Sequence, residues 1–137
     1  MIQEISINNA DQYYKLGAEL NANFIKLFNI DEIINNKYNK IYGYFVNDEL
    51  LGFIHLLISF EEADIVNIIV KEEFRKEHIA TKLIDYAVKK NNLNVLNLEV
   101  RVSNPAVAFY KKIGFKLIRI IKNYYESEDA YFMKKVF

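Results

Sequence analysis

A charged turn is the first stretch whose residue types and position could do chemistry. It carries Arg75 and Lys76 and follows residues 65–70, a β-branched run long enough for one buried strand. Beyond it, apolar residues recur at helical spacing from Ile79 onward. A helix start presents unpaired N–H groups and the positive end of the helix dipole, which suit a phosphate. We predict that this turn binds the pyrophosphate of a cofactor; the alternative is a solvated turn between a strand and a helix.

The second stretch is residues 95–102, where apolar and polar residues alternate. One face of the expected strand is apolar, and the other carries Asn97, Glu99 and Arg101. A charge inside a sheet is costly unless it has a partner or meets water. The polar face therefore either meets solvent or lines a polar cleft, and the alternative for Glu99 is an ion pair with Arg101 or a neighbouring strand.

The rest of the chain supplies the elements that must position these residues. Asn47-Asp48 is typical of a turn between two strands, and Gly52 indicates a bulge or a close backbone approach in the second of them. Pro105 begins a helix that Gly114 ends. We expect strands at residues 2–7, 41–46, 50–60, 63–70, 95–102, 115–121 and 130–136, and helices at about 9–20, 24–35, 75–92 and 105–113.

This order of elements predicts the α+β class, with about four helices packed on a mixed, mostly antiparallel sheet of about seven strands. A chain of 137 residues fits one domain, residues 1–137. An apolar fraction of 52% is typical of a folded globule.

Composition also excludes several classes of function. The net charge is zero, so we expect neither nucleic-acid nor membrane-surface binding. The absence of cysteine removes disulfides and thiolate chemistry, and only two isolated histidines, His55 and His78, argue against a metal site. His55 lies in an apolar run and is expected to be structural. No signal peptide or long apolar span is found, so we expect a cytoplasmic protein.

Several motifs resemble a known superfamily. The pattern Arg75-x-x-His78-x-Ala80 resembles the arginine/glutamine-x-x-glycine-x-glycine/alanine signature of the GNAT N-acetyltransferases, with histidine in place of the central glycine. From Ala63 to Val136 the chain resembles the RimI-type ribosomal-protein alanine N-acetyltransferases, through Asn67-Ile68-Ile69-Val70, Leu98-Glu99-Val100-Arg101, Ser103-Asn104, Ala106, Tyr110, Gly114-Phe115, Asn123-Tyr124-Tyr125, Glu128-Asp129-Ala130 and Met133.

The resemblance implies a GNAT-like fold and acetyl-CoA as the acetyl donor. It places cofactor contacts at the end of one strand, the turn and the helix start, namely Ile68, Ile69, Val70, Arg75, Lys76, Glu77, His78, Ile79 and Ala80. Asn104 would contact the pantetheine arm, and Tyr110 would lie near the thioester.

The same resemblance implies catalytic and acceptor-binding residues. Glu99 would act as the general base, through a water molecule, and Tyr110 as the general acid, since a phenol suits proton donation to a thiolate. The alternatives are an ordinary ion pair for Glu99 and a core position for Tyr110. Asn67, Glu99, Tyr124 and Tyr125 would contact the acceptor; Glu128 and Asp129 either join them at the peptide entrance or form an exposed polar hairpin tip.

The predicted reaction is acetyl transfer to a primary amine, most simply a protein N-terminus. An α-amino group titrates near 7.7–8 and a lysine side chain near 10.4, so an N-terminus needs about 3.4 kcal/mol less work to deprotonate. Two departures stand beside His78. The Asn104–Tyr110 spacing is one residue shorter than in the family, which could move Asn104 away from the pantetheine arm. The family's aromatic-Pro-Trp segment, which helps shape the acceptor site, is replaced by residues 23–28, and this leaves the acceptor open. The alternatives are a small amine, such as a polyamine or amino sugar, and a non-catalytic acyl-CoA-binding module. We expect a monomer or weak homodimer.

Overall fold

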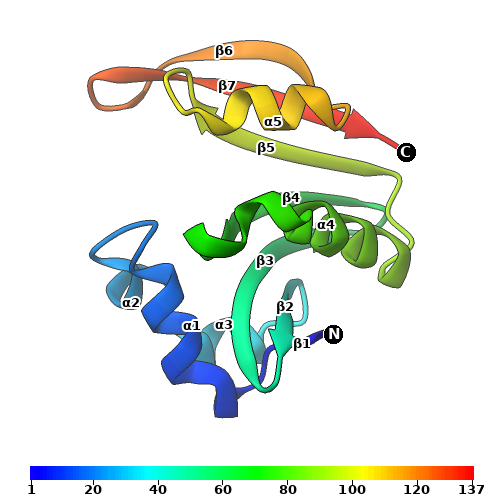
Figure 1. Ribbon diagram of the computed structural model, residues 1–137. Helices are drawn as coiled ribbons and strands as arrows, with labels where there is room; N and C mark the ends of the chain where they lie inside the picture. The colour runs from blue at the N-terminus through cyan, green and yellow to red at the C-terminus, as the bar shows by residue number, and fades with distance from the viewer.

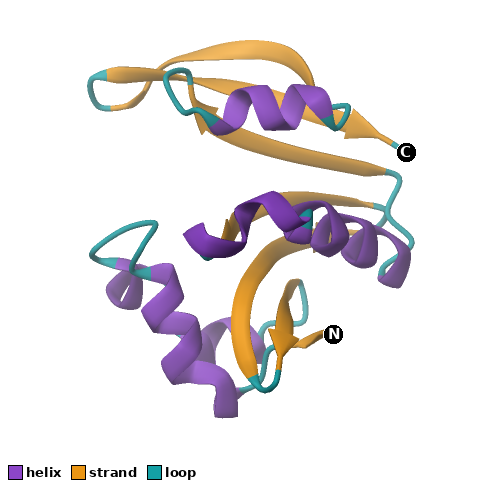
Figure 2. Ribbon diagram, in the orientation of Figure 1, coloured by secondary structure: helices purple, strands orange, loops and turns teal.

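The computed structural model describes residues 1–137 as a seven-stranded sheet with helices on both faces (Figures 1 and 2). The strand order is β1-β2-β3-β4-β5-β7-β6. The strands are β1 (Ile2–Glu4), β2 (Asn39–Val46), β3 (Glu49–Ser59), β4 (Glu62–Val70), β5 (Val95–Arg101), β6 (Lys116–Tyr125) and β7 (Glu128–Val136). The helices are α1 (Ala10–Gly17), α2 (Phe24–Leu27), α3 (Ile30–Asn35), α4 (Ile79–Lys90) and α5 (Ala106–Lys112), with 3-10 turns η1 (Ile7–Asn9) and η2 (Glu72–Glu77).

The sheet is antiparallel except at its centre, where β4 and β5 run parallel. These two strands pair only from Glu62↔Val95 to Asp64↔Asn97. Beyond that point they separate, so that β1–β4 and β5–β7 form two halves that spread apart, as Figure 1 shows. The predicted α+β class and mostly antiparallel sheet are confirmed.

Two apolar clusters lie on opposite faces of the sheet. In the larger one, α4 and α5 pack on the strands through side chains such as Leu83, Tyr110 and Leu96. In the smaller one, α1, α2 and α3 pack on β2 and β3, and the rings of Tyr13, Phe24 and Phe53 contact one another. The helices of the smaller cluster cover only the N-terminal half of the sheet (Figure 1).

Several predicted boundaries are wrong, for local reasons. The helix expected over residues 24–35 is two short helices, because Asn29 adopts an extended conformation and its side chain accepts a hydrogen bond from the Glu32 N–H, which starts α3. The helix expected from Arg75 begins only at Ile79, since His78 is left-handed at φ 61°. The first strand stops at Glu4, and both closing strands are longer than predicted.

Other expectations are confirmed. Asn47 and Asp48 both have positive φ, as a tight two-residue hairpin requires. A Cβ on Gly52 would lie 2.9 Å from the Ile69 carbonyl oxygen, so only glycine allows this strand spacing. His55 is buried, its Nε2 lies 2.7 Å from Asn39 Oδ1, and burial lowers its pKa to about 4, which agrees with a structural role, although its Nδ1 has no hydrogen-bond partner.

The structure contains no helix that is both long and apolar enough to cross a membrane.

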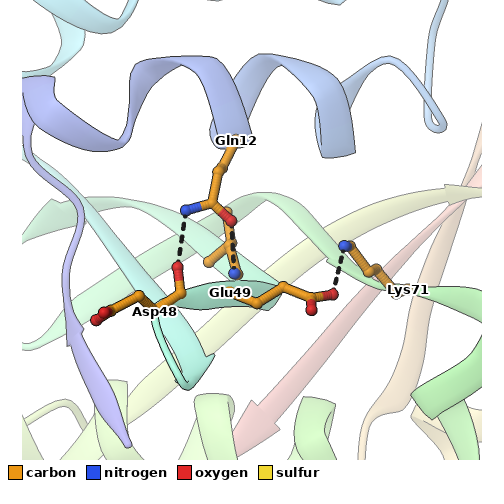
Figure 3. A network of polar contacts seen from close by, with 5 residues as sticks. Gln12, Asp48, Glu49 and Lys71 are labelled. Carbon is orange, nitrogen blue, oxygen red and sulfur yellow. Dashed lines mark hydrogen bonds and ion pairs between the residues drawn. The ribbon is translucent and has the colours of Figure 1, made fainter.

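A polar network fixes the β2–β3 hairpin to α1 and to the segment after β4. In Figure 3, Gln12 reaches from α1 to the turn: its Nε2 donates to the Asp48 carbonyl at 3.0 Å, and its Oε1 accepts from the Leu50 N–H at 2.8 Å. Lys71 donates to Glu49 Oε2 at 2.8 Å. The hairpin is thereby tied to the start of the turn that the sequence assigns to a phosphate.

Replacement of Gln12 by alanine should lower the free energy of unfolding by about 1 to 2 kcal/mol, because two hydrogen bonds are lost and the Leu50 N–H is left without its partner. Urea denaturation monitored by circular dichroism measures the change. The control is Gln3→Ala, since Gln3 is exposed and its side chain makes no hydrogen bond in the structure. Equal stability of the two variants would show that the network does not stabilise the fold.

Candidate active site

The separation of β4 and β5 opens a cavity of about 380 Å³ in the middle of the sheet. It brings together six of the residues that the sequence assigned to the site, from β4, β5, the loop before α5, α5 and β6: Asn67, Ile68, Glu99, Asn104, Tyr110 and Tyr125. Side chains of α2, among them Phe24 and Leu27, line the cavity from the other face of the sheet. These elements therefore place the predicted base, the predicted acid and all the predicted acceptor residues except Tyr124 around one space.

One edge of β4 is free to hydrogen-bond a ligand. After Asp64 the strand has no partner on the β5 side, and the pairs His55↔Asn67 and Leu56↔Ile65 leave Val66 as an extra, bulged residue. Backbone groups that are buried normally find partners. Asn67 also has a buried side-chain Nδ2 without a partner. The free edge and this amide fit an extended chain with amide groups of its own, such as pantetheine.

Glu99 lies on the polar face of β5, and its carboxylate is exposed. The Tyr124 hydroxyl donates to Glu99 Oε2 at 2.7 Å, and this hydrogen bond raises the pKa of Tyr124 to about 12. Arg101 is engaged elsewhere, because it pairs with Glu128 at 3.5 Å and lies 4.2 Å from the centre of the Tyr125 ring. The alternative expectation of a Glu99–Arg101 ion pair is therefore wrong, and the carboxylate keeps one oxygen free.

Tyr110 is both a core residue and part of the cavity wall. Its ring packs edge-on against Phe109 and Phe115, with ring centres 5.5 and 5.6 Å away. Burial raises the pKa of Tyr110 to about 12, so its hydroxyl is protonated at neutral pH. A core position and a role as general acid are therefore compatible, because Tyr110 packs in the core and also lines the cavity.

The predicted phosphate turn lies at the far end of β4, outside this cavity. Arg75 Nε donates to the Val70 carbonyl at 3.0 Å, which fixes the guanidinium close to the strand end. His78 stands immediately before α4, whose first N–H groups have no partner within the helix. Ile69, Val70 and Ile79 have buried side chains, so any contact they make with a cofactor would come from the backbone.

The remaining predicted residues divide into two groups. Asn104 Oδ1 accepts from the Ala106 N–H at 2.8 Å, so it supports the start of α5 as well as lining the cavity. Tyr124 and Tyr125 line a second cavity beside Glu99. Glu128 accepts from the Ser103 N–H at 2.8 Å, which ties the β6–β7 hairpin to the segment after β5, and Asp129 accepts from the Asn123 N–H at 2.9 Å within the hairpin.

Sequence reasoning missed the Tyr124–Glu99 hydrogen bond and the contribution of α2. The bond depends on the register of β5, β7 and β6, in which Glu99 lies opposite Phe132 and Phe132 lies opposite Arg119, so no local pattern contains it. No group of three or more histidine, aspartate or glutamate side chains is placed to hold a metal ion.

Comparison with known proteins agrees with this geometry. Residues 9–127 match the family model for the acetyltransferase (GNAT) domain, and the chain belongs to this family. It is 32% identical over 139 residues to a putative ribosomal protein bS18-alanine N-acetyltransferase of Bacillus subtilis, covering 96% of this chain and 92% of that one.

A second relative is an N-alpha-acetyltransferase of Saccharolobus solfataricus, 41% identical over 106 residues. That match covers 71% of this chain and 64% of the archaeal protein. Among solved structures, an aminoglycoside 6'-N-acetyltransferase complexed with coenzyme A superposes with a TM-score of 0.85 over 99% of this chain and 96% of that one, at 18% identity. At this identity the superposition shows the fold alone.

His78 is the position where the turn differs from the family signature, and its effect on acetyl-CoA binding can be measured. A glycine would remove both the left-handed strain and the Cβ beside the helix start. This steric relief should let His78→Gly bind acetyl-CoA as tightly as wild type or more tightly.

Isothermal titration calorimetry provides the measurement. His78→Asn is the matched control, because asparagine tolerates the left-handed conformation and keeps a Cβ but lacks the imidazole ring. Much weaker binding by the glycine variant would instead identify the imidazole as an active cofactor ligand.

Proposed function

We propose that this protein transfers an acetyl group from acetyl-CoA to the α-amine of a protein N-terminus. The observation that carries the proposal is the single cavity in which Glu99 and Tyr110 face the unpaired edge of β4. The names of the Bacillus and Saccharolobus relatives support a peptide α-amine as acceptor. Action as a monomer or weak homodimer in the cytoplasm is part of this proposal.

Acetyl-CoA supplies an activated acetyl group and a thiolate leaving group. The free edge of β4 would hold the pantetheine arm, and N–H groups near the bulge would polarise the thioester carbonyl as an oxyanion hole does. Arg75 and the amides that start α4 would bind the pyrophosphate. These contacts would bring the carbonyl carbon into the cavity that Glu99 and Tyr110 line.

The two titratable residues would then move protons in opposite directions. Glu99, held by Tyr124, would accept a proton from the acceptor ammonium through a water molecule, which leaves a neutral amine to attack. Tyr110, protonated because burial raises its pKa to about 12, would donate to the departing thiolate. An α-amine suits a single exposed carboxylate better than a lysine side chain does, because it is closer to neutrality at pH 7.

The acceptor is tested by measuring acetyl-CoA turnover with three amines. They are a peptide with N-terminal alanine, an N-blocked peptide with one lysine, and spermidine. We expect the first to have the highest kcat/KM. Preference for spermidine would replace the proposed function with small-amine acetylation, and no turnover of any amine would favour a non-catalytic acyl-CoA-binding module.

Acetyl-CoA should also stabilise the fold, because it would bind the native edge of β4 and the α4 start but not the unfolded chain. At 100 times the Kd, the free energy of unfolding should rise by about 2.7 kcal/mol. Thermal unfolding with and without millimolar acetyl-CoA measures this as a rise in Tm. Adenosine, which lacks the pyrophosphate and the pantetheine arm, is the control ligand. An unchanged Tm would contradict the proposed cofactor.

Substitution of the proposed base and acid should reduce turnover without loss of fold. Glu99→Gln and Tyr110→Phe should each lower kcat by about 100-fold or more, while Glu99→Gln leaves acetyl-CoA affinity nearly unchanged. The Glu99→Gln defect should shrink as pH rises, since more of the amine is then already neutral. Glu126→Gln, at the exposed tip of the β6–β7 hairpin, is the control. Turnover near wild type in either variant would remove that residue from the mechanism.

A further inference from the structure

Two buried side-chain nitrogens without a hydrogen-bond partner, His55 Nδ1 and Asn67 Nδ2, belong to residues that face each other across β3 and β4. Opposite residues of an antiparallel pair point to the same side of the sheet, with Cβ atoms about 4.5–5.5 Å apart. On that side the ring of Phe28 packs edge-on against His55, with ring centres 6.2 Å apart. Phe28 and Asn67 both line the cavity of the candidate active site, so His55 lies directly behind its wall.

The hydrogen-bonding role of the His55 ring is fixed by its other nitrogen. Asn39 Oδ1 lies 2.7 Å from His55 Nε2, and an amide oxygen only accepts, so Nε2 carries the hydrogen. Burial lowers the pKa of His55 to about 4, which keeps the ring neutral near pH 7. In a neutral ring with its hydrogen on Nε2, the remaining nitrogen is an acceptor. His55 therefore presents a buried acceptor, Nδ1, that the chain itself leaves unused.

The orientation of the Asn67 amide follows from burial. The side chain is half-buried and lines an open cavity, yet its Nδ2 is buried. A nitrogen that faced the cavity would be accessible, so Nδ2 lies on the inner side, toward β3, and Oδ1 is the end that reaches the cavity. A buried donor on Asn67 thus faces the buried acceptor on His55. One water molecule that accepts from Nδ2 and donates to Nδ1 satisfies both groups.

We propose that His55 is a positioning residue for the transfer reaction: through a bridging water it holds the Asn67 amide with Oδ1 toward the cavity, where Oδ1 accepts an N–H of the acceptor amine. This inference rests on the proposed function and adds a residue to it. A half-turn of the amide exchanges its oxygen and nitrogen, and the reversed amide would present a donor to the donating amine. The acceptor on His55 selects the productive orientation, which leaves the amine lone pair free to attack after Glu99 has accepted a proton.

Steady-state kinetics with the N-terminal alanine peptide test the role of the ring. His55→Leu has no acceptor for the water, so the KM of the peptide should rise about fivefold while the KM of acetyl-CoA stays unchanged. His55→Gln keeps both a donor for Asn39 and an acceptor for the water, so its peptide KM should stay within twofold of wild type. Ile54→Val is the matched control for stability, because Ile54 is the preceding buried residue on β3 and packs in the larger cluster instead. An equal rise in peptide KM for Ile54→Val or His55→Gln would overturn the proposal.

The pathway through Asn67 is tested by a double-mutant cycle. Asn67→Ala removes the amide that His55 is proposed to orient, so adding His55→Leu to this variant should change the peptide KM by less than 1.5-fold, an order-of-magnitude limit set by additivity. Independent effects, in which the double variant shows the product of the two single changes, would overturn the inference. Such a result with full wild-type turnover of the peptide would leave the proposed function intact.

Nitrogen-15 NMR of the imidazole gives a readout that does not depend on turnover. Wild type should show the hydrogen on Nε2, and the Nδ1 resonance should move in Asn67→Ala but not in Ile54→Val. A hydrogen on Nδ1, or an Nδ1 resonance that ignores Asn67, would contradict the proposed contact. If wild type acetylates spermidine and not the peptide, the same variants are compared with spermidine, and the proposed peptide function fails while this inference is decided by the cycle. Absence of turnover with every amine would overturn both.

Discussion

The short parallel contact between β4 and β5 is the constraint on which the rest of the structure depends. Three residue pairs join the two halves of the sheet, and beyond Asp64↔Asn97 the strands separate. A continuous sheet would satisfy the backbone groups along both edges. Here one edge of β4 is released from pairing, while its other edge remains bonded to β3 as far as Gly52↔Val70. The released edge is rigid because its partner strand holds it, which suits a ligand that binds as an extended chain.

The two halves of the sheet, β1–β4 and β5–β7, keep their relative positions although no strand fills the gap between them. Each has its own helix on the same face, α4 for the N-terminal half and α5 for the C-terminal half, and both pack into one apolar cluster. On the opposite face, α1 to α3 cover only the N-terminal half. That asymmetry leaves the polar face of β5 without a covering helix, so Glu99 and Asn97 can border cavities instead of an apolar core.

The local parts of this arrangement could be predicted from the sequence. The β-branched run before Lys71, the helical spacing after Ile79 and the alternation around Glu99 each depend on neighbours in the chain. The fold class followed from their order, and the grouping of Glu99 with Tyr110 followed from resemblance. The break at Asn29 was less visible, because one side-chain cap outweighs a helical apolar pattern over so short a segment.

What could not be predicted depends on contacts between distant segments. The Tyr124–Glu99 hydrogen bond joins residues 25 positions apart through strand register, and Asn97 is paired with Glu62 across 35 positions. The point at which β4 and β5 separate is likewise a property of the whole sheet. Alternation identified the polar face of β5, but it could not choose between solvent, a cleft and an ion pair, because the pairing of Arg101 with Glu128 joins distant segments.

The position of Glu99 explains how one carboxylate borders two cavities. In a strand, successive side chains point to opposite faces, so Leu98 and Val100 enter the apolar cluster while Glu99 points away from it. Toward the paired part of β4, Glu99 borders the cavity that Asp64 and Asn97 line. Where β4 has separated from β5, Glu99 also borders the cavity that Tyr110 lines. A carboxylate one pair earlier on β5 would be enclosed by β4, and one pair later it would lie at the end of the strand. The end of β4–β5 pairing thus places the proposed base where a donor approaching through the gap and an acceptor lying on the open face would meet.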